Sequence, residues 1–268
     1  MDTSLSGKVL KIITTVTFIA MVVVNALANI LPINGVNTGD ISNSYPNLFA
    51  PTALTFTIWG LIYLLLALHT LYQLGFLQHK EPVNEALLRK VDILFSISSL
   101  ANTAWIFMWH YRLIPLSMLM MIVILLCLIL INNSIRNEDL SSREKFFIKL
   151  PFSIYFGWIT IATIANAVTL LVALEWNGFG ISEPIWTILI LLIGTLIGGF
   201  TTFKNRNVAY GLVLVWAYIG ILIKHVSPDG FGGEYLAVIV AVSVCLVCLV
   251  AVIGYVIFGK KKTSAFTN

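Results

Sequence analysis

Eight apolar runs, each about as long as the hydrocarbon core of a bilayer is thick, divide this chain of 268 residues. A spanning α-helix needs roughly 20 apolar residues, because each residue rises about 1.5 Å. With 59% hydrophobic and only 10% charged residues, the chain cannot cover a water-soluble surface. We therefore predict an all-α fold, a polytopic transmembrane helix bundle. Its helices are expected at residues 9–31, 52–77, 91–109, 113–133, 148–174, 185–203, 208–226 and 235–258.

The basic residues alternate between the two sides of these predicted spans. Fourteen of the 16 Lys and Arg residues fall on one side, and only Arg112 and Lys224 fall on the other. Because cytoplasmic loops carry an excess of Lys and Arg, we expect a multi-pass protein of the cell membrane with both termini in the cytoplasm. The net charge of +4 is thus a topology signal, and nucleic acid is not an expected partner. The fourteen are Lys8, Lys11, Lys80, Arg89, Lys90, Arg136, Arg143, Lys145, Lys149, Lys204, Arg206, Lys260, Lys261 and Lys262.

The first apolar run, within residues 1–31, admits two interpretations. Two lysines followed by an apolar stretch with small residues resemble a secretory signal peptide. The stretch continues to Leu31 and is long enough to span, which favours a retained transmembrane helix. Asn25 and Asn29 lie one helical turn apart, so we expect a neighbouring helix to satisfy amides on that face.

Residues 32–51 form a long loop on the predicted outer side. The loop is rich in turn-forming residues and holds a single charge, Asp40. It also holds several large apolar residues, which a solvated linker would lack. We therefore predict an ordered lid over the outer face of the bundle.

The deep parts of the predicted spans are expected to lack charged side chains. Ionisable residues in spanning helices are costly and usually mark proton relays or ion-coupled carriers. His69 is the only titratable side chain expected well inside, and we expect it to be a hydrogen-bonded packing residue. This pattern argues against an ion-coupled carrier.

Polar and aromatic residues instead share faces on three predicted helices, because residues three, four or seven apart lie on one side of a helix. Trp158 lies about 15 Å deep, where an indole N–H needs a partner from protein, water or ligand. Such faces fit either helix packing or an apolar, aromatic pocket. Three other tryptophans, Trp109, Trp176 and Trp186, are expected to be anchors at the outer interface. The three sets are Phe56, Trp59 and Tyr63; Ser98, Asn102, Trp105 and Trp109; and Pro151, Tyr155, Trp158, Ala162 and Asn166.

Three segments resemble the tryptophan-rich sensory protein and translocator protein family, also called peripheral benzodiazepine receptors. They are Pro51 to Tyr63, which is similar to a Pro-x7-Trp-x3-Tyr motif; Asn102 to Trp105, which is similar to an Asn-x-x-Trp motif; and Trp158 to Asn166, with its Ala-Thr-x-x-Asn end. By this resemblance the family's five-helix core would occupy residues 52–203. One additional helix would precede this core, two would follow at 204–258, and a basic cytoplasmic tail would occupy 259–268. The chain departs from the family's paired prolines, which are reduced here to Ala50-Pro51.

The resemblance implies a pocket, closed by the first outer loop, that binds porphyrins, haem-like tetrapyrroles or sterols. We predict that the protein binds such a lipophilic, planar small molecule for sensing or trafficking, with no required cofactor, no metal and no catalytic residue. The alternative is a permease or an accessory subunit of a transport complex, in which the same faces only pack helices. A photochemical porphyrin-degrading enzyme is a third function class that the family suggests. A homodimer is a further alternative for the oligomeric state. The positions that match the family's pocket are Trp59, Tyr63, Asn102, Trp105, Trp158, Ala162 and Asn166.

Overall fold

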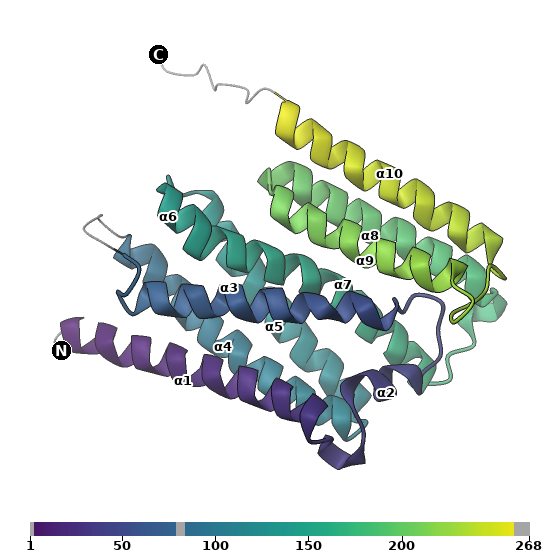
Figure 1. Ribbon diagram of the computed structural model, residues 1–268, viewed down its shortest axis with the longest axis horizontal. Helices are drawn as coiled ribbons and strands as arrows, with labels where there is room; N and C mark the ends of the chain where they lie inside the picture. The colour runs from purple at the N-terminus through teal and green to yellow at the C-terminus, as the bar shows by residue number, and fades with distance from the viewer. Residues whose placement is uncertain (1–2, 79–83, 260–268) are drawn as a thin grey trace.

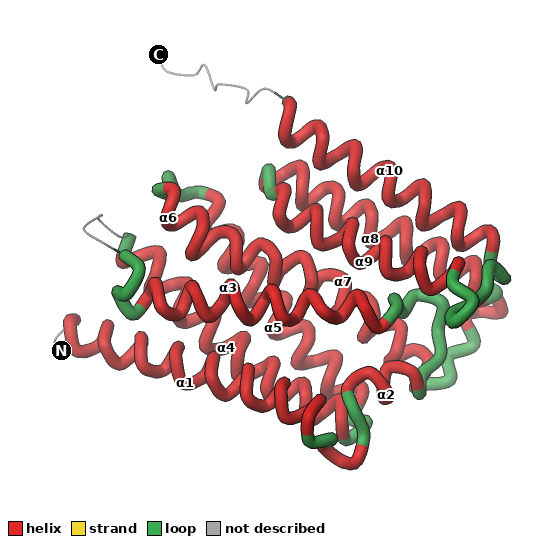
Figure 2. The backbone as a smooth tube through the Cα atoms, in the orientation of Figure 1, coloured by secondary structure: helices red, strands yellow, loops and turns green. Residues whose placement is uncertain are grey.

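The computed structural model describes residues 3–78 and 84–259, and this part of the chain is helical with connecting loops and no strand (Figures 1 and 2). Eight of its helices are long and apolar enough to cross a membrane, which confirms the predicted multi-pass bundle. Lys80 and the predicted basic tail from Lys260 onward lie outside the described residues. The eight helices are α1 (Thr3–Ile30), α3 (Ile58–Gln73), α4 (Glu85–His110), α5 (Ile114–Arg136), α7 (Leu150–Ala173), α8 (Glu183–Asn205), α9 (Val208–Val226) and α10 (Leu236–Phe258).

The two ends of the bundle differ in their loops. Helix α1 begins and α10 ends at the same end, called the terminal end below (Figure 1). The opposite end, called the lid end, is covered by residues 32–51, called the lid. Of the described Lys and Arg residues, only Arg112 and Lys224 lie in the half next to the lid. The short elements are η1 (Ile33–Gly35), α2 (Thr38–Asn43), η2 (Ala53–Thr57) and η4 (Gly178–Gly180) at the lid end, and α6 (Ser142–Glu144) and the π-helical turn η3 (Lys145–Lys149) at the terminal end.

The helices form two groups, and the division differs from the expected core at residues 52–203. Helix α1 packs with α3 and α4, which join α5 and α7 in a five-helix group. Helices α8, α9 and α10 form a three-helix group beside it, and α9 packs directly against α7 (Figure 1). Glycines explain why α8 lies there: a side chain at Gly198 would collide with Leu214 of α9, and one at Gly211 would lie 2.9 Å from Thr202 of α8. In this packing α1 belongs with α3, α4, α5 and α7, and α9 joins the two groups through its contact with α7.

A chain of buried amide and hydroxyl groups ties α1 into the five-helix group. The Asn25 amide of α1 donates to the Asn102 side-chain oxygen of α4 at 2.7 Å. The Asn102 amide in turn lies 3.4 Å from the Tyr155 hydroxyl of α7. Asn25 thus meets a neighbouring helix as expected, whereas Asn29 donates back to the Asn25 carbonyl of its own helix. Interhelical bonds of this kind help to fix which helices pack together in a membrane.

An acidic side chain is buried in a spanning helix, which corrects the expectation that the deep segments have none. Helix α4 begins at Glu85, six residues before the predicted start at residue 91. Asp92 therefore lies about 10 Å along the helix and not at its boundary. Its side chain is 2% exposed and faces His69 of α3, which is fully buried.

Candidate ligand site beneath the lid

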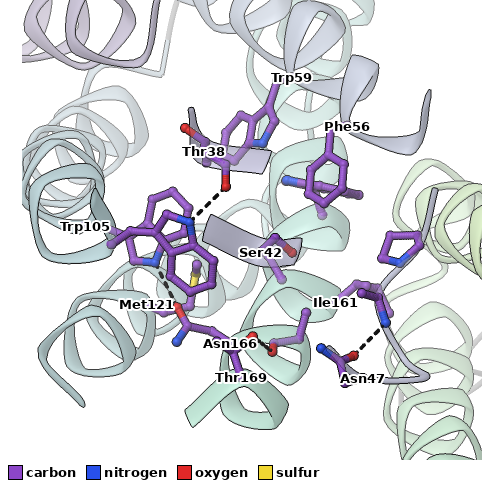
Figure 3. Close-up of a pocket in the computed structure, with 16 residues that line it drawn as sticks. Thr38, Ser42, Asn47, Phe56, Trp59, Trp105, Met121, Ile161, Asn166 and Thr169 are labelled. Atoms are coloured by element: carbon purple, nitrogen blue, oxygen red, sulfur yellow. Dashed lines mark hydrogen bonds between the residues drawn. The ribbon is translucent and has the colours of Figure 1, made fainter. Parts of the chain in front are cut away.

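A cavity of about 70 Å³ lies at the lid end of the five-helix group (Figure 3). The lid covers it, the start of α3 and the lid-end halves of α4 and α7 form its walls, and α5 contributes Met121. Four of the seven tryptophans of the chain line this one cavity. Such a concentration of indole rings around a small apolar space is typical of a site for an aromatic or lipophilic ligand. The four are Trp59, Trp105, Trp109 and Trp158.

The rings on the α3 and α7 side of the cavity pack edge to face. The indole of Trp158 meets that of Trp59 at an interplanar angle of 81°, with 6.2 Å between ring centroids. Phe56 meets Trp158 at 84° and 5.7 Å. Edge-to-face packing of this kind fixes the positions of the rings. Figure 3 shows Phe56 and Trp59 on one side of the cavity and Asn166 on the opposite side.

The indole N–H of Trp158 has no partner among the described residues. Its side chain is 2% exposed, and its Nε1 atom makes no hydrogen bond within residues 3–78 and 84–259. A buried donor without an acceptor costs roughly 1–3 kcal/mol. Because Trp158 lines the cavity, an acceptor atom of a ligand placed there could recover this cost.

The polar groups on the opposite side of the cavity are paired with one another. The Trp105 indole donates to the Asn166 side-chain oxygen at 2.8 Å, and the Asn166 amide lies 3.2 Å from the Ser117 hydroxyl of α5. These bonds fix the orientation of the Asn166 amide, which is 2% exposed. Asn166 therefore offers a ligand one fixed amide edge with a single uncommitted N–H.

Five of the seven residues predicted for the site line the cavity: Trp59, Trp105, Trp158, Ala162 and Asn166. The other two lie outside the lining. Tyr63 stacks on the back of Trp59 at 5.3 Å, and Asn102 is engaged between Asn25 and Tyr155. The two therefore support neighbouring helices and the wall behind the cavity.

Trp109 is buried beneath the lid, which corrects its expected place among the interfacial anchors. It is 5% exposed, stacks on Trp105 at 5.4 Å, and donates its indole N–H to the Thr38 carbonyl at 3.1 Å. The reason is the lid itself, whose fully buried Ile41 packs against the Trp109 ring. A tryptophan that ends a spanning helix is an anchor only where nothing covers it. Trp176 and Trp186, in contrast, lie half-buried near the lid end of the neighbouring helices.

Two histidines at helix ends, which sequence reasoning missed, fasten the lid. His110 of α4 donates from Nδ1 to the Ile33 carbonyl at 3.1 Å, and its Nε2 lies 3.0 Å from the Thr38 hydroxyl. On the other side, His225 of α9 bonds to the Leu48 carbonyl at 2.9 Å. Histidines at the outer ends of two predicted spans, opposite a loop with few charges, are the signal that could have found these contacts.

The three-helix group also holds the lid through α8 and α9. Glu183 accepts a hydrogen bond from the Leu48 backbone N–H at 3.0 Å, so Leu48 is held on both its N–H and its carbonyl. Just after the lid, the Trp216 indole of α9 donates to the Thr55 carbonyl of η2 at 2.9 Å. One consequence is that the additional helices position the segment that closes the cavity.

The fold and the site define a polytopic membrane protein with an aromatic cavity beneath an ordered lid. The sequence matches the family model described as TSPO-like protein over residues 11–255, a range that runs from α1 into α10. The chain therefore belongs to the TSPO-like family, and the match includes both helix groups. Comparison with curated proteins and with solved structures gave no significant match.

Proposed function

We propose that this protein binds a lipophilic, planar small molecule between the lid and Trp158, for sensing or trafficking. The observation that carries the proposal is the buried, unpaired indole N–H of Trp158, which lies in a cavity walled by aromatic rings. A ligand with a flat apolar body and an acceptor at its edge matches both properties. Porphyrins and related tetrapyrroles have this form, and sterols supply the apolar body with one hydroxyl oxygen.

The small size of the cavity adds a condition to this proposal. Its volume of about 70 Å³ is far below the roughly 300–1,000 Å³ of a usual ligand pocket. A ligand of the proposed size therefore enters only when α2 and the residues around it move outward. Ala162, one turn beyond Trp158, then leaves clearance for the ligand because its side chain is a single methyl group.

Fluorescence titration of the full-length protein in nanodiscs tests the proposal. Protoporphyrin should quench tryptophan emission saturably, with an affinity that partition into empty nanodiscs of the same lipid cannot explain. A sterol, added as a competitor, should displace the porphyrin if both occupy the same cavity. Quenching that rises linearly with porphyrin concentration, at the level seen for partition alone, would rule out a tetrapyrrole site.

A permease is the second candidate function, and one observation favours it. Asp92 is buried in a spanning helix against His69, and such intramembrane acids commonly belong to ion-coupled carriers. Proteoliposomes that accumulate a lipophilic solute only under an imposed pH gradient would support this candidate. A solute distribution that does not change with the pH gradient would argue against a permease and leave ligand binding as the proposed function.

A further inference from the structure

A buried imidazole and a buried carboxylate face each other in the terminal half of the five-helix group, away from the cavity beneath the lid. His69 Nε2 of α3 lies 3.5 Å from Asp92 Oδ1 of α4. The side chains are 0% and 2% exposed, and neither atom makes a hydrogen bond within residues 3–78 and 84–259. Unsatisfied ionisable groups at such depth are costly, so their retention in two adjoining helices requires a reason.

The backbone next to His69 determines which ring nitrogen carries a proton. Pro151 has no N–H, so it cannot donate to the Phe147 carbonyl four residues earlier, as a helical residue would. His69 Nδ1 lies 2.9 Å from this carbonyl oxygen. Because a carbonyl only accepts, Nδ1 is the donor. A neutral His69 therefore presents the lone pair of Nε2 to Asp92.

This arrangement places two acceptors opposite each other. An ionised Asp92 and a neutral His69 with its proton on Nδ1 would repel across 3.5 Å. Aromatic rings border the imidazole, with the Phe152 centroid 4.8 Å and the Phe95 centroid 5.8 Å from its own. One additional proton removes the repulsion, because either an imidazolium or a carboxylic acid then donates across the gap.

A further pocket connects Asp92 of this pair to the terminal end. It has a volume of about 270 Å³ and reaches Asp92 between α1 and α4. Its charged lining groups besides Asp92 are Lys11 of α1 and Glu85 and Arg89 of α4. Helix α1 also contributes Thr14, which bonds to Ser96 beside Asp92, and η3 contributes the Phe147 carbonyl. Asp92 thus lies between a polar opening and the enclosed ring of His69.

We propose that His69 and Asp92 form a proton-binding site, which holds one proton between the two side chains and exchanges it through the pocket lined by Lys11 and Arg89. The proton comes from solvent at the terminal end and adds to His69 Nε2 or to the Asp92 carboxylate without any other bond changing. The site is independent of ligand binding beneath the lid, so either proposal can fail without the other.

Nuclear magnetic resonance of the full-length protein in nanodiscs, with ¹⁵N-labelled histidine, tests the site directly. At about pH 7.5 both nitrogens of His69 should be protonated, or infrared difference spectra should show a protonated carboxyl that Asp92→Asn removes. In Asp92→Asn, His69 should return to the neutral form with its proton on Nδ1. The spectrum of His69→Gln assigns the resonances.

His225 is a matched internal control. One of its ring nitrogens also bonds to a backbone carbonyl and the other is also unpartnered, but no carboxylate lies within ion-pair distance of it in the described part of the chain. His225 should be neutral at the same pH and unchanged by Asp92→Asn. If Asp92→Asn does not fold, the protonation state of His69 and Asp92 in the wild-type protein is sufficient to test the proposal. A neutral His69 observed together with an ionised Asp92 would overturn the proposal.

Discussion

The indole rings of Trp59 and Trp158 meet at 81° with their centroids 6.2 Å apart, and both rings line the cavity beneath the lid. The contact joins the start of α3 to the middle of α7. It also holds the Trp158 ring in place while its N–H stays unpaired within the described residues. A ring that is fixed by packing and lacks a hydrogen-bond acceptor is already arranged to bind one.

Replacement of Trp158 by Phe should weaken ligand binding and leave the fold intact. The variant keeps an aromatic ring but removes the N–H donor, and a hydrogen bond of this kind contributes about 1–2 kcal/mol, or roughly five- to thirty-fold in affinity. Porphyrin titration measures the effect. Trp186→Phe is the matched control, because that indole donates to the Gly178 carbonyl outside the cavity. Equal losses in the two variants would show that the effect is not specific to the cavity.

Ala162→Leu should block binding by filling the space next to Trp158. The added carbon atoms would occupy a cavity of only about 70 Å³, so a ligand could enter only by forcing the helices apart. Loss of saturable porphyrin binding, with an unchanged helix content by circular dichroism, is the expected result. Ala251→Leu on the exposed face of α10 is the control and should bind like the parent. Normal affinity in Ala162→Leu would place the ligand elsewhere.

The lid should resist proteolysis as long as Ile41 anchors it. Ile41 is fully buried against Trp109 and Ile114, and truncation of such a side chain to Ala costs about 2–5 kcal/mol. Local opening should therefore become at least about 30-fold more frequent, and cleavage within residues 37–45 correspondingly faster. Ile30→Ala, at a position 74% exposed, should not change the rate. Rapid cleavage of the wild type that no ligand slows would show that the lid is a simple connector.

Glu183→Ala should let the lid open more readily, because Leu48 loses the acceptor of its backbone N–H. A hydrogen bond to a charged group contributes about 1.5–3 kcal/mol, so the ligand association rate should rise by at least about ten-fold. Stopped-flow quenching measures this rate. Glu175→Ala, which removes an exposed carboxylate near the same end of the bundle, should leave the rate unchanged. An unchanged rate in Glu183→Ala would mean that α8 does not hold the lid.

Both termini should lie in the cytoplasm, since the described basic residues other than Arg112 and Lys224 lie in the terminal half of the bundle. Reporter fusions before Met1 and after Asn268 should report the cytoplasmic side. A reporter inserted at Arg112 should report the outer side. N-terminal sequencing should find α1 retained, and a mature chain that begins near Asn29 would mean that the first helix is a cleaved signal.

The sequence predicts the eight spans well because length and hydropathy are properties of each segment alone. The grouping of the helices depends on pairs of surfaces, which a single sequence does not reveal. The expected core at 52–203 included α8, although Gly198 and Gly211 fit α8 against α9. The Asn25–Asn102 bond similarly places α1 in the five-helix group, and from the sequence the partner of Asn25 could only be described as a neighbouring helix.

Helix periodicity identifies which residues share a face but not what that face meets. Asn102 and Trp105 share one face of α4, yet Asn102 meets α1 and Trp105 lines the cavity. Trp109 has the sequence pattern of an interfacial anchor because the lid that covers it lies far away in the sequence. Asp92 was missed because the predicted helix began at residue 91, and helix ends are the least certain part of such a prediction.

The most direct test of the central claim is the indole ¹H–¹⁵N resonance of Trp158, followed as porphyrin is added to the full-length protein in nanodiscs. Trp158→Phe assigns this resonance among those of the seven tryptophans. If the unpaired N–H donates a hydrogen bond to the ligand, the Trp158 signal should shift towards lower field and saturate at one equivalent of ligand, while the Trp186 signal stays in place. A Trp158 signal that does not move while porphyrin binds saturably would contradict the account, because the ligand would then occupy a site that this N–H does not reach.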